Sequence, residues 1–177
     1  ILLPTVLRAL LPQLGALVVD ESFADPVPEL SLAGETGPPG LWVLRSFGKF
    51  YGLAGLRLGF ALGAPEAAGR LAALAGPWPV SGAAVEIGAQ ALGDRDWQRA
   101  TAERLAQDTL RLDRLSPWPR VGGTALFRLY ETPDAAAAQA RLARHRIHSR
   151  IFPWSPRLIR LGLPAADEWD RVARALA

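Results

Sequence analysis

Short apolar runs that alternate with helical segments constrain the fold of this chain more than any other feature. One run covers 16–20 and ends in Asp20, a second covers 41–44, and a third is expected at 57–62. Such runs are typical of buried strands, and the amphipathic segments between them are typical of helices. In open α/β sheets, ligands gather outside the carboxyl ends of the strands. The alternation therefore predicts an α/β fold with Asp20 at a ligand-binding edge.

Capping residues and periodicity predict the other elements. Ser81 and Asp94 are good N-caps for two of the expected helices, and Asp134 lies near the start of a third. The glycine pair 122–123 is expected to mark a hinge-like start of the last third of the chain. Helices are expected at 6–14, 65–75, 83–92, 97–115, 134–144 and 166–175, and further strands at 125–130, 147–152 and 158–163.

Lys49 is the only lysine among the twenty lysines and arginines of the chain. It follows the second apolar run, in the glycine-rich segment 46–59. An arginine there could supply charge and bind phosphate, but its guanidinium stays protonated. A lysine can be deprotonated and form a Schiff base. We therefore interpret Lys49 as an amine nucleophile rather than as a surface lysine.

Composition excludes several functional classes. The chain has no cysteine, so it forms neither a disulfide nor a thiolate–metal site. His145 and His148 lack further ligands nearby in the sequence, and no metal site is expected. The net charge is only +3 and the arginines are scattered, so no nucleic-acid partner is expected. No run approaches the ~18 apolar residues of a membrane span. We expect a soluble, cytoplasmic protein.

The segment 46–59, SFGKFYGLAGLRLG, resembles the cofactor-lysine signature of fold-type I pyridoxal-phosphate enzymes, the aspartate aminotransferase superfamily. The segments VVDESFAD (18–25), RSFGKFYG (45–52) and VGGT (121–124) are similar, in the same order, to a branch of cobalamin biosynthesis. This branch contains the threonine-phosphate decarboxylases and their aminotransferase-like relatives. The resemblance extends over nearly the whole chain.

The resemblance implies a two-domain α/β enzyme, which is longer than this chain. We therefore expect the chain to be the later part of a longer protein. Residues 1–115 would form the C-terminal part of the cofactor-binding large domain, with a mostly parallel sheet and the connecting helix. Residues 116–177 would form the small C-terminal α/β domain. The family also implies a homodimer.

Four residues match positions that bind pyridoxal 5'-phosphate in the family. Asp20 would stabilise the protonated ring nitrogen, and Lys49 would hold the cofactor covalently. Ser46 and Arg57 would bind its phosphate, because a hydroxyl and a guanidinium are suited to a dianion. Phe23 departs from the tyrosine that many relatives carry there, and a phenylalanine cannot donate a hydrogen bond to the ring oxygen. Phenylalanine is familiar at this place in the cobalamin branch.

Two further arginines are expected to bind the substrate. Arg160 resembles the family arginine that holds the substrate's α-carboxylate, and its flanking apolar residues predict that it points to the opposite face of its strand. Arg150 resembles an arginine that binds substrate phosphate or carboxylate. The implied reaction is decarboxylation of L-threonine O-3-phosphate to aminopropanol phosphate. Two alternatives are an aminotransferase of the histidinol-phosphate type, and an inactive fragment that serves as an interaction module.

Overall fold

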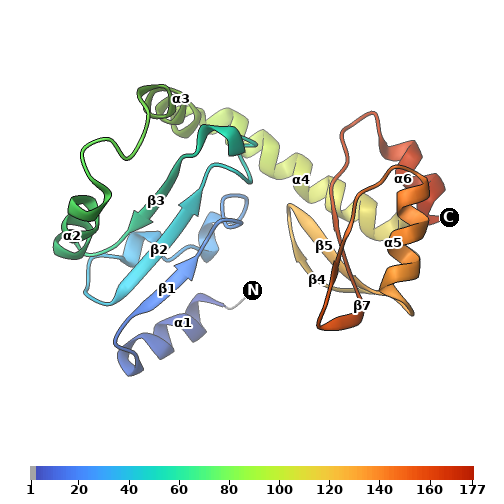
Figure 1. Ribbon diagram of the computed structural model, residues 1–177, viewed down its shortest axis with the longest axis horizontal. Coiled ribbons are helices and arrows are strands. Elements are labelled where there is room, and N and C mark those ends of the chain that lie inside the picture. The colour runs from blue at the N-terminus through green and yellow to red at the C-terminus, as the bar shows by residue number, and fades with distance from the viewer. Residues whose placement is uncertain (1–2) are drawn as a thin grey trace. The chain divides into compact units, whose positions relative to one another are not determined.

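The computed structural model describes residues 3–177 and divides into two compact units. Unit 1 comprises Ile1–Arg99 and unit 2 comprises Ala100–Ala177. Each unit contains its own sheet with helices beside it (Figure 1). Helix α4 (Arg95–Leu115) crosses the division. The α/β class predicted from the sequence is confirmed, whereas the domain boundary predicted at residue 115 stays a prediction.

Unit 1 contains a three-stranded sheet in the order β1-β2-β3. Its strands are β1 (Leu17–Asp20), β2 (Leu41–Ser46) and β3 (Gly59–Leu62). The pairing of β1 with β2 is parallel, as expected, but β3 is antiparallel to β2. The sheet of unit 1 is therefore mixed, and the sequence does not indicate that β3 runs antiparallel. A parallel return needs a long crossover, whereas 47–58 forms tight turns and the short helix η4 (Ala54–Leu56).

The helices of unit 1 begin and end at residues that explain their limits. Pro4 stands at the first position of α1, where its missing N–H costs nothing, and Pro12 follows in a short 3₁₀ turn. Ser81 caps α3 by accepting a hydrogen bond from the N–H of Ala84. The helices are α1 (Pro4–Leu10), η1 (Leu11–Gln13), η2 (Pro28–Leu30), η3 (Ala33–Glu35), α2 (Pro65–Ala75) and α3 (Gly82–Gly93).

The two faces of the unit 1 sheet differ. Leu41 and Val43 of β2 are buried and pack with Leu7 of α1 in one apolar cluster. On the other face, Val18 of β1 is 59% exposed. Because side chains alternate along a strand, Asp20 shares the open face with Val18. This face is open to solvent at the end of β1.

Unit 2 contains a four-stranded antiparallel sheet in the order β4-β5-β7-β6. The strand expected at 125–130 forms as β5, and a second strand, β4, which the sequence does not predict, precedes it and contains the glycine pair 122–123. Gly123 has a φ of +132°, and a Cβ there would stand 2.5 Å from the carbonyl oxygen of Phe127. The pair thus permits a bulged strand rather than a hinge. The strands are β4 (Arg120–Thr124), β5 (Phe127–Glu131), β6 (Arg150–Phe152) and β7 (Ser155–Gly162).

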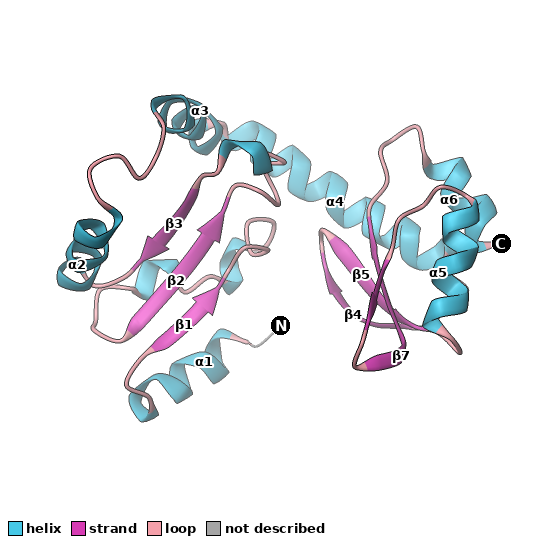
Figure 2. Cartoon of the chain, in the orientation of Figure 1, coloured by secondary structure: helices cyan, strands magenta, loops and turns pink. Residues whose placement is uncertain are grey.

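Helices α5 (Ala135–Arg144) and α6 (Trp169–Leu176) pack on one face of this sheet (Figure 2). Tyr130, Leu142, Ile159 and Leu176 form the centre of the core, each at most 2% exposed. Asp134, which was expected near the start of a helix, is the N-cap of α5 and accepts hydrogen bonds from the N–H groups of its first turn. None of the helices in 3–177 is both long enough and apolar enough to cross a bilayer.

Candidate active site

The Asp20 carboxylate lies at the carboxyl end of β1. Asp20 pairs with Leu44 of β2, so it lies on the same face of the sheet as Ser46. Ser22 donates two hydrogen bonds to Asp20 Oδ1, from its hydroxyl at 2.5 Å and from its backbone N–H at 2.9 Å. These bonds hold the pKa of Asp20 below its ordinary value, and the positive charge of Lys49 lowers that pKa further. Asp20 is therefore ionised at neutral pH.

The Lys49 side chain is exposed in the turn that follows β2. Its Nζ lies 5.8 Å from the centroid of the Phe23 ring, where a cation is attracted to an aromatic face. None of the ion pairs between residues 3 and 177 includes Lys49. The amine is thus close enough to Asp20 to act on its pKa and is not engaged by a carboxylate of the described chain.

Ser46 and Arg57 lie at the two ends of the turn that carries Lys49. Ser46 is the last residue of β2, pairs with Gly59 of β3, and accepts a hydrogen bond from the N–H of Gly48 at 3.2 Å. Arg57 has a left-handed backbone with a φ of 55°, and its Nη1 donates to the carbonyl of Ala54 at 3.3 Å. The turn therefore carries a hydroxyl, an amine and a guanidinium, which together suit a phosphorylated aldehyde.

A buried ion network behind this edge was not predicted from the sequence. Arg45 Nη1 donates to Glu21 Oε2 at 3.1 Å, and Arg45 Nη2 donates to Asp25 Oδ1 at 2.5 Å. Glu21 also accepts hydrogen bonds from the Ser31 hydroxyl at 2.5 Å and from the Leu32 N–H at 2.6 Å. Glu21 is structural, because only 5% of it is exposed.

Tyr51, which follows Lys49 closely, belongs to an aromatic cluster. Its ring stacks on Phe47 at a centroid distance of 4.4 Å and on Trp97 at 5.8 Å, and Phe50 meets both Tyr51 and Trp97 edge-on. Burial raises the pKa of the Tyr51 hydroxyl. These contacts favour a packing role for Tyr51, which supports the rigid turn on which Lys49 is presented.

In unit 2, Arg150 and Arg160 stand directly opposite each other in the pairing of β6 with β7. Opposed residues share a face, and like charges there are destabilising. The guanidinium of Arg160 lies 5.1 Å from the Phe127 ring centroid, and that of Arg150 lies 5.8 Å from Phe152. No ion pair within 3–177 neutralises either arginine. The pair is therefore suited to binding an anion from solution.

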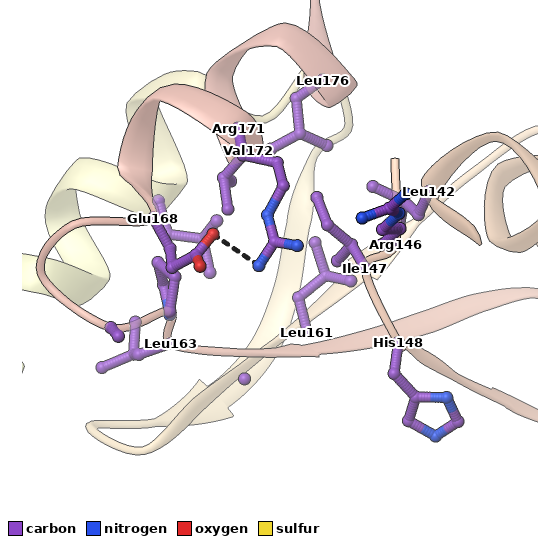
Figure 3. Close-up of a pocket in the computed structure, with 14 residues that line it drawn as sticks. Leu142, Arg146, Ile147, His148, Leu161, Leu163, Glu168, Arg171, Val172 and Leu176 are labelled. Atoms are coloured by element: carbon purple, nitrogen blue, oxygen red, sulfur yellow. Dashed lines mark ion pairs between the residues drawn. The ribbon is translucent and has the colours of Figure 1, made fainter. Parts of the chain in front are cut away.

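A cavity of about 420 Å³ lies on the opposite, helix-covered side of this sheet. Figure 3 shows that Arg171 points into it and pairs with Glu168, at a distance of 2.5 Å. Leu161 lines the cavity, so its strand neighbour Arg160 points away from it. The cavity and the two opposed arginines are thus separate features of unit 2.

Comparison with known proteins matches residues 6–175 to the family "Aminotransferase class I and II". A threonine-phosphate decarboxylase of Pseudomonas aeruginosa is 48% identical over 166 residues, which cover 92% of this chain and 50% of that protein. The chain spans about half the length of these curated relatives.

Two solved structures show the same fold. The histidinol-phosphate aminotransferase of Sinorhizobium meliloti, in complex with pyridoxal-5'-phosphate, has a TM-score of 0.80 and 25% identity. The match covers 91% of this chain and 47% of that one. The L-threonine-O-3-phosphate decarboxylase of Porphyromonas gingivalis has a TM-score of 0.80 and 21% identity, and the match covers 99% of this chain and 59% of that one.

Proposed function

Since the chain belongs to the aminotransferase class I and II family, we propose that the protein containing it is a pyridoxal-phosphate-dependent decarboxylase. Its reaction would convert L-threonine O-3-phosphate to aminopropanol phosphate and carbon dioxide, in cobalamin biosynthesis. The observation that carries the proposal is the 48% identity with a threonine-phosphate decarboxylase over 92% of the chain. We extend the proposal to a cytoplasmic homodimer, as the resemblance to fold-type I enzymes implies.

The residues at the end of β1 and β2 fit the cofactor. Asp20 offers an ionised carboxylate, which a protonated ring nitrogen requires. Lys49 offers an amine that no carboxylate of the described chain engages in an ion pair, and Phe23 offers an apolar surface beside it. Ser46 and Arg57 supply the hydroxyl and the guanidinium for the phosphate. Pyridoxal 5'-phosphate, when bound, supplies an electron sink for the charge left on the α-carbon of the substrate.

Each residue of the candidate site then has a distinct role. Asp20 would stay ionised and hold a proton on the ring nitrogen, with its carboxylate oriented by Ser22. Decarboxylation replaces the bond from the α-carbon to the carboxylate by a bond to hydrogen. Lys49 Nζ would supply this proton, because a lysine amine can gain and lose protons whereas an arginine cannot.

The opposed arginines of unit 2 would bind the two anionic groups of the substrate. Arg160 is the candidate for the carboxylate and Arg150 for the phosphate or carboxylate. Both groups accept paired hydrogen bonds from a planar guanidinium. A bound anion would also remove the repulsion between the two arginines, which are opposed in the pairing of β6 with β7.

Borohydride trapping in the full-length protein tests the cofactor assignment. The cofactor should be fixed on the peptide that contains Lys49, which is the only lysine within 1–177. Lys49→Arg is the matched control, because it keeps the charge and removes the amine. A trapped cofactor on a peptide from elsewhere in the protein would contradict the assignment.

The alternative is an aminotransferase of the histidinol-phosphate type, which the 25% identity with such an enzyme favours. Product analysis separates the two reactions. With O-phosphothreonine and no keto acid, a decarboxylase should release carbon dioxide over many turnovers. An aminotransferase would stop after one turnover until a keto acid is added. A stall of this kind would overturn the decarboxylase proposal and leave the cofactor assignment unchanged.

A further inference from the structure

Segment 21–25 forms an arch whose two ends are tied to one arginine. Arg45 pairs with Glu21 at 3.1 Å and with Asp25 at 2.5 Å. Between the two carboxylates, the N–H of Ala24 donates to the carbonyl of Glu21 at 3.0 Å, which makes a turn. The two ion pairs therefore close the segment into one unit, the 21–25 arch.

Two of the three residues between the ends of the arch contact the candidate active site. Ser22 donates both of its hydrogen bonds to Asp20 Oδ1. Phe23 lies beside the amine of Lys49. A movement of the arch would therefore change the environment of the carboxylate and of the amine together.

Arg45 itself lies on the other face of the sheet. It precedes Ser46 in β2, and neighbouring strand residues point to opposite faces. The side chains of the network are shielded from water, with exposed fractions of 22% for Arg45, 5% for Glu21 and 10% for Asp25. Arg45 is thus connected to Ser22 and Phe23 through the arch.

The charges show why this arginine is needed. The network contains two carboxylates and one guanidinium, and Asp25 Oδ2 is a buried oxygen with no hydrogen-bond partner in the described chain. Without Arg45, both carboxylates would lose their cation while shielded from water, which is strongly unfavourable. A lysine would keep the charge, but its single ammonium does not offer the planar fork that reaches both ends of the arch.

We propose that Arg45 is a positioning residue that holds the 21–25 arch, so that Ser22 orients the Asp20 carboxylate and Phe23 lies against Lys49. This inference rests on the proposed function, because it assigns the arch to the cofactor site. It adds Arg45, Glu21 and Asp25 to the residues on which the reaction depends.

Hydrogen exchange on the cofactor-free, full-length protein tests the first half of the inference. In Arg45→Met, the amides of Ser22 and Leu32, which both donate to carboxylates of this edge, should exchange more than about tenfold faster. Arg128→Met is the matched control. Arg128 is also buried and ion-paired, with Asp113 of unit 2, and its loss should leave exchange in 21–33 unchanged.

The pH dependence of the cofactor's visible absorption tests the second half. A misplaced Asp20 would stabilise the protonated form of the ring nitrogen less. A less positive ring would withdraw less electron density from the nitrogen of Lys49. The midpoint of the absorption change should therefore rise by about one pH unit in Arg45→Met, and by less in Arg45→Lys. It should not move in Arg128→Met, although this variant also loses a buried ion pair.

The outcomes separate the two proposals. Faster exchange in 21–33 together with a shifted midpoint supports the positioning role. Faster exchange with the wild-type midpoint, or unchanged exchange, would overturn it and leave the proposed function standing. If the wild-type protein carries no cofactor on Lys49, the proposed function fails, while the exchange experiment still decides whether Arg45 holds the arch. Should Arg45→Met not fold, Arg45→Lys provides the same comparison.

Discussion

Gly88 of α3 lies where the turn that presents Lys49 packs closely against the helix. A Cβ at Gly88 would overlap Leu58 Cδ2, and it would stand 3.9 Å from Leu58 Cγ and 4.0 Å from Phe47 Cε1. Leu58 is buried and follows Arg57, the candidate phosphate ligand. Gly88→Ala is therefore expected to push Leu58 away from α3 and to disturb the phosphate end of the site.

The change in the free energy of unfolding caused by Gly88→Ala follows from two opposing contributions. Inserting a methyl group into a packed contact costs about 1–3 kcal/mol. Alanine is the better helix former by about 0.8–1.0 kcal/mol. Gly88→Ala should thus lower the free energy of unfolding by about 0–2 kcal/mol.

Gly69→Ala in α2 is the matched control, because a Cβ at Gly69 meets no atom within 4 Å. This variant should gain the helix-propensity contribution alone, about 0.8–1.0 kcal/mol. Urea unfolding of the cofactor-free, full-length protein measures both variants, and equilibrium dialysis measures cofactor retention. If Gly88→Ala is as stable as Gly69→Ala and retains cofactor like the wild type, the contact between α3 and Leu58 does not support the site.

Three further predictions concern charges at the two candidate sites. Arg57→Ala should cost about 1.5–3 kcal/mol of cofactor affinity by dialysis, whereas Arg160→Ala should leave it unchanged. Ser22→Ala should raise the pKa of Asp20. The pKa of Asp20 is lower in the folded protein than in the unfolded chain. The stabilisation that the ionised Asp20 provides is therefore present above pH ~3.9 and is lost as the pH falls through the folded pKa. The midpoint of urea unfolding should accordingly fall less steeply in acid for Ser22→Ala than for the wild type. Arg150→Gln should stabilise the substrate-free protein by about 0.2–1 kcal/mol and weaken binding of O-phosphothreonine in calorimetry.

Elements that are determined by residues within or beside them could be predicted from the sequence. Helix α2 has the bounds expected for it, Ser81 and Asp94 accept the capping hydrogen bonds expected of them, and Asp134 stands at the start of α5. A cap acts on amides two or three residues away, so its sequence position is sufficient evidence. The strand end at Asp20 could be found for the same reason, since an apolar run ends there.

Elements that depend on pairing with distant residues could not be predicted. Strand β4 contains two glycines and no apolar alternation, so only its pairing with β5 makes it a strand. The ion pairs of Arg45 were not predicted, although the sequence of β2 indicates them. Arg45 shares the buried face of β2 with Leu41 and Val43, and a cation at such a position requires carboxylates. The alternation along β2 indicates that Arg45 needs carboxylate partners, but only the folded chain identifies them as Glu21 and Asp25.

The candidate residues divide between the units according to their chemistry. Asp20, Ser46, Lys49 and Arg57 lie in unit 1 and suit a cofactor that many family members share, whereas Arg150 and Arg160 lie in unit 2 and suit a particular anion. Replacing a residue of the first group should disable any reaction of the family, because each would act on the cofactor itself. Under the proposed function, replacing an arginine of the second group would change which substrate is bound and how its carboxylate is held. Differences between decarboxylases and aminotransferases of this family are therefore to be sought on the open face of β6 and β7.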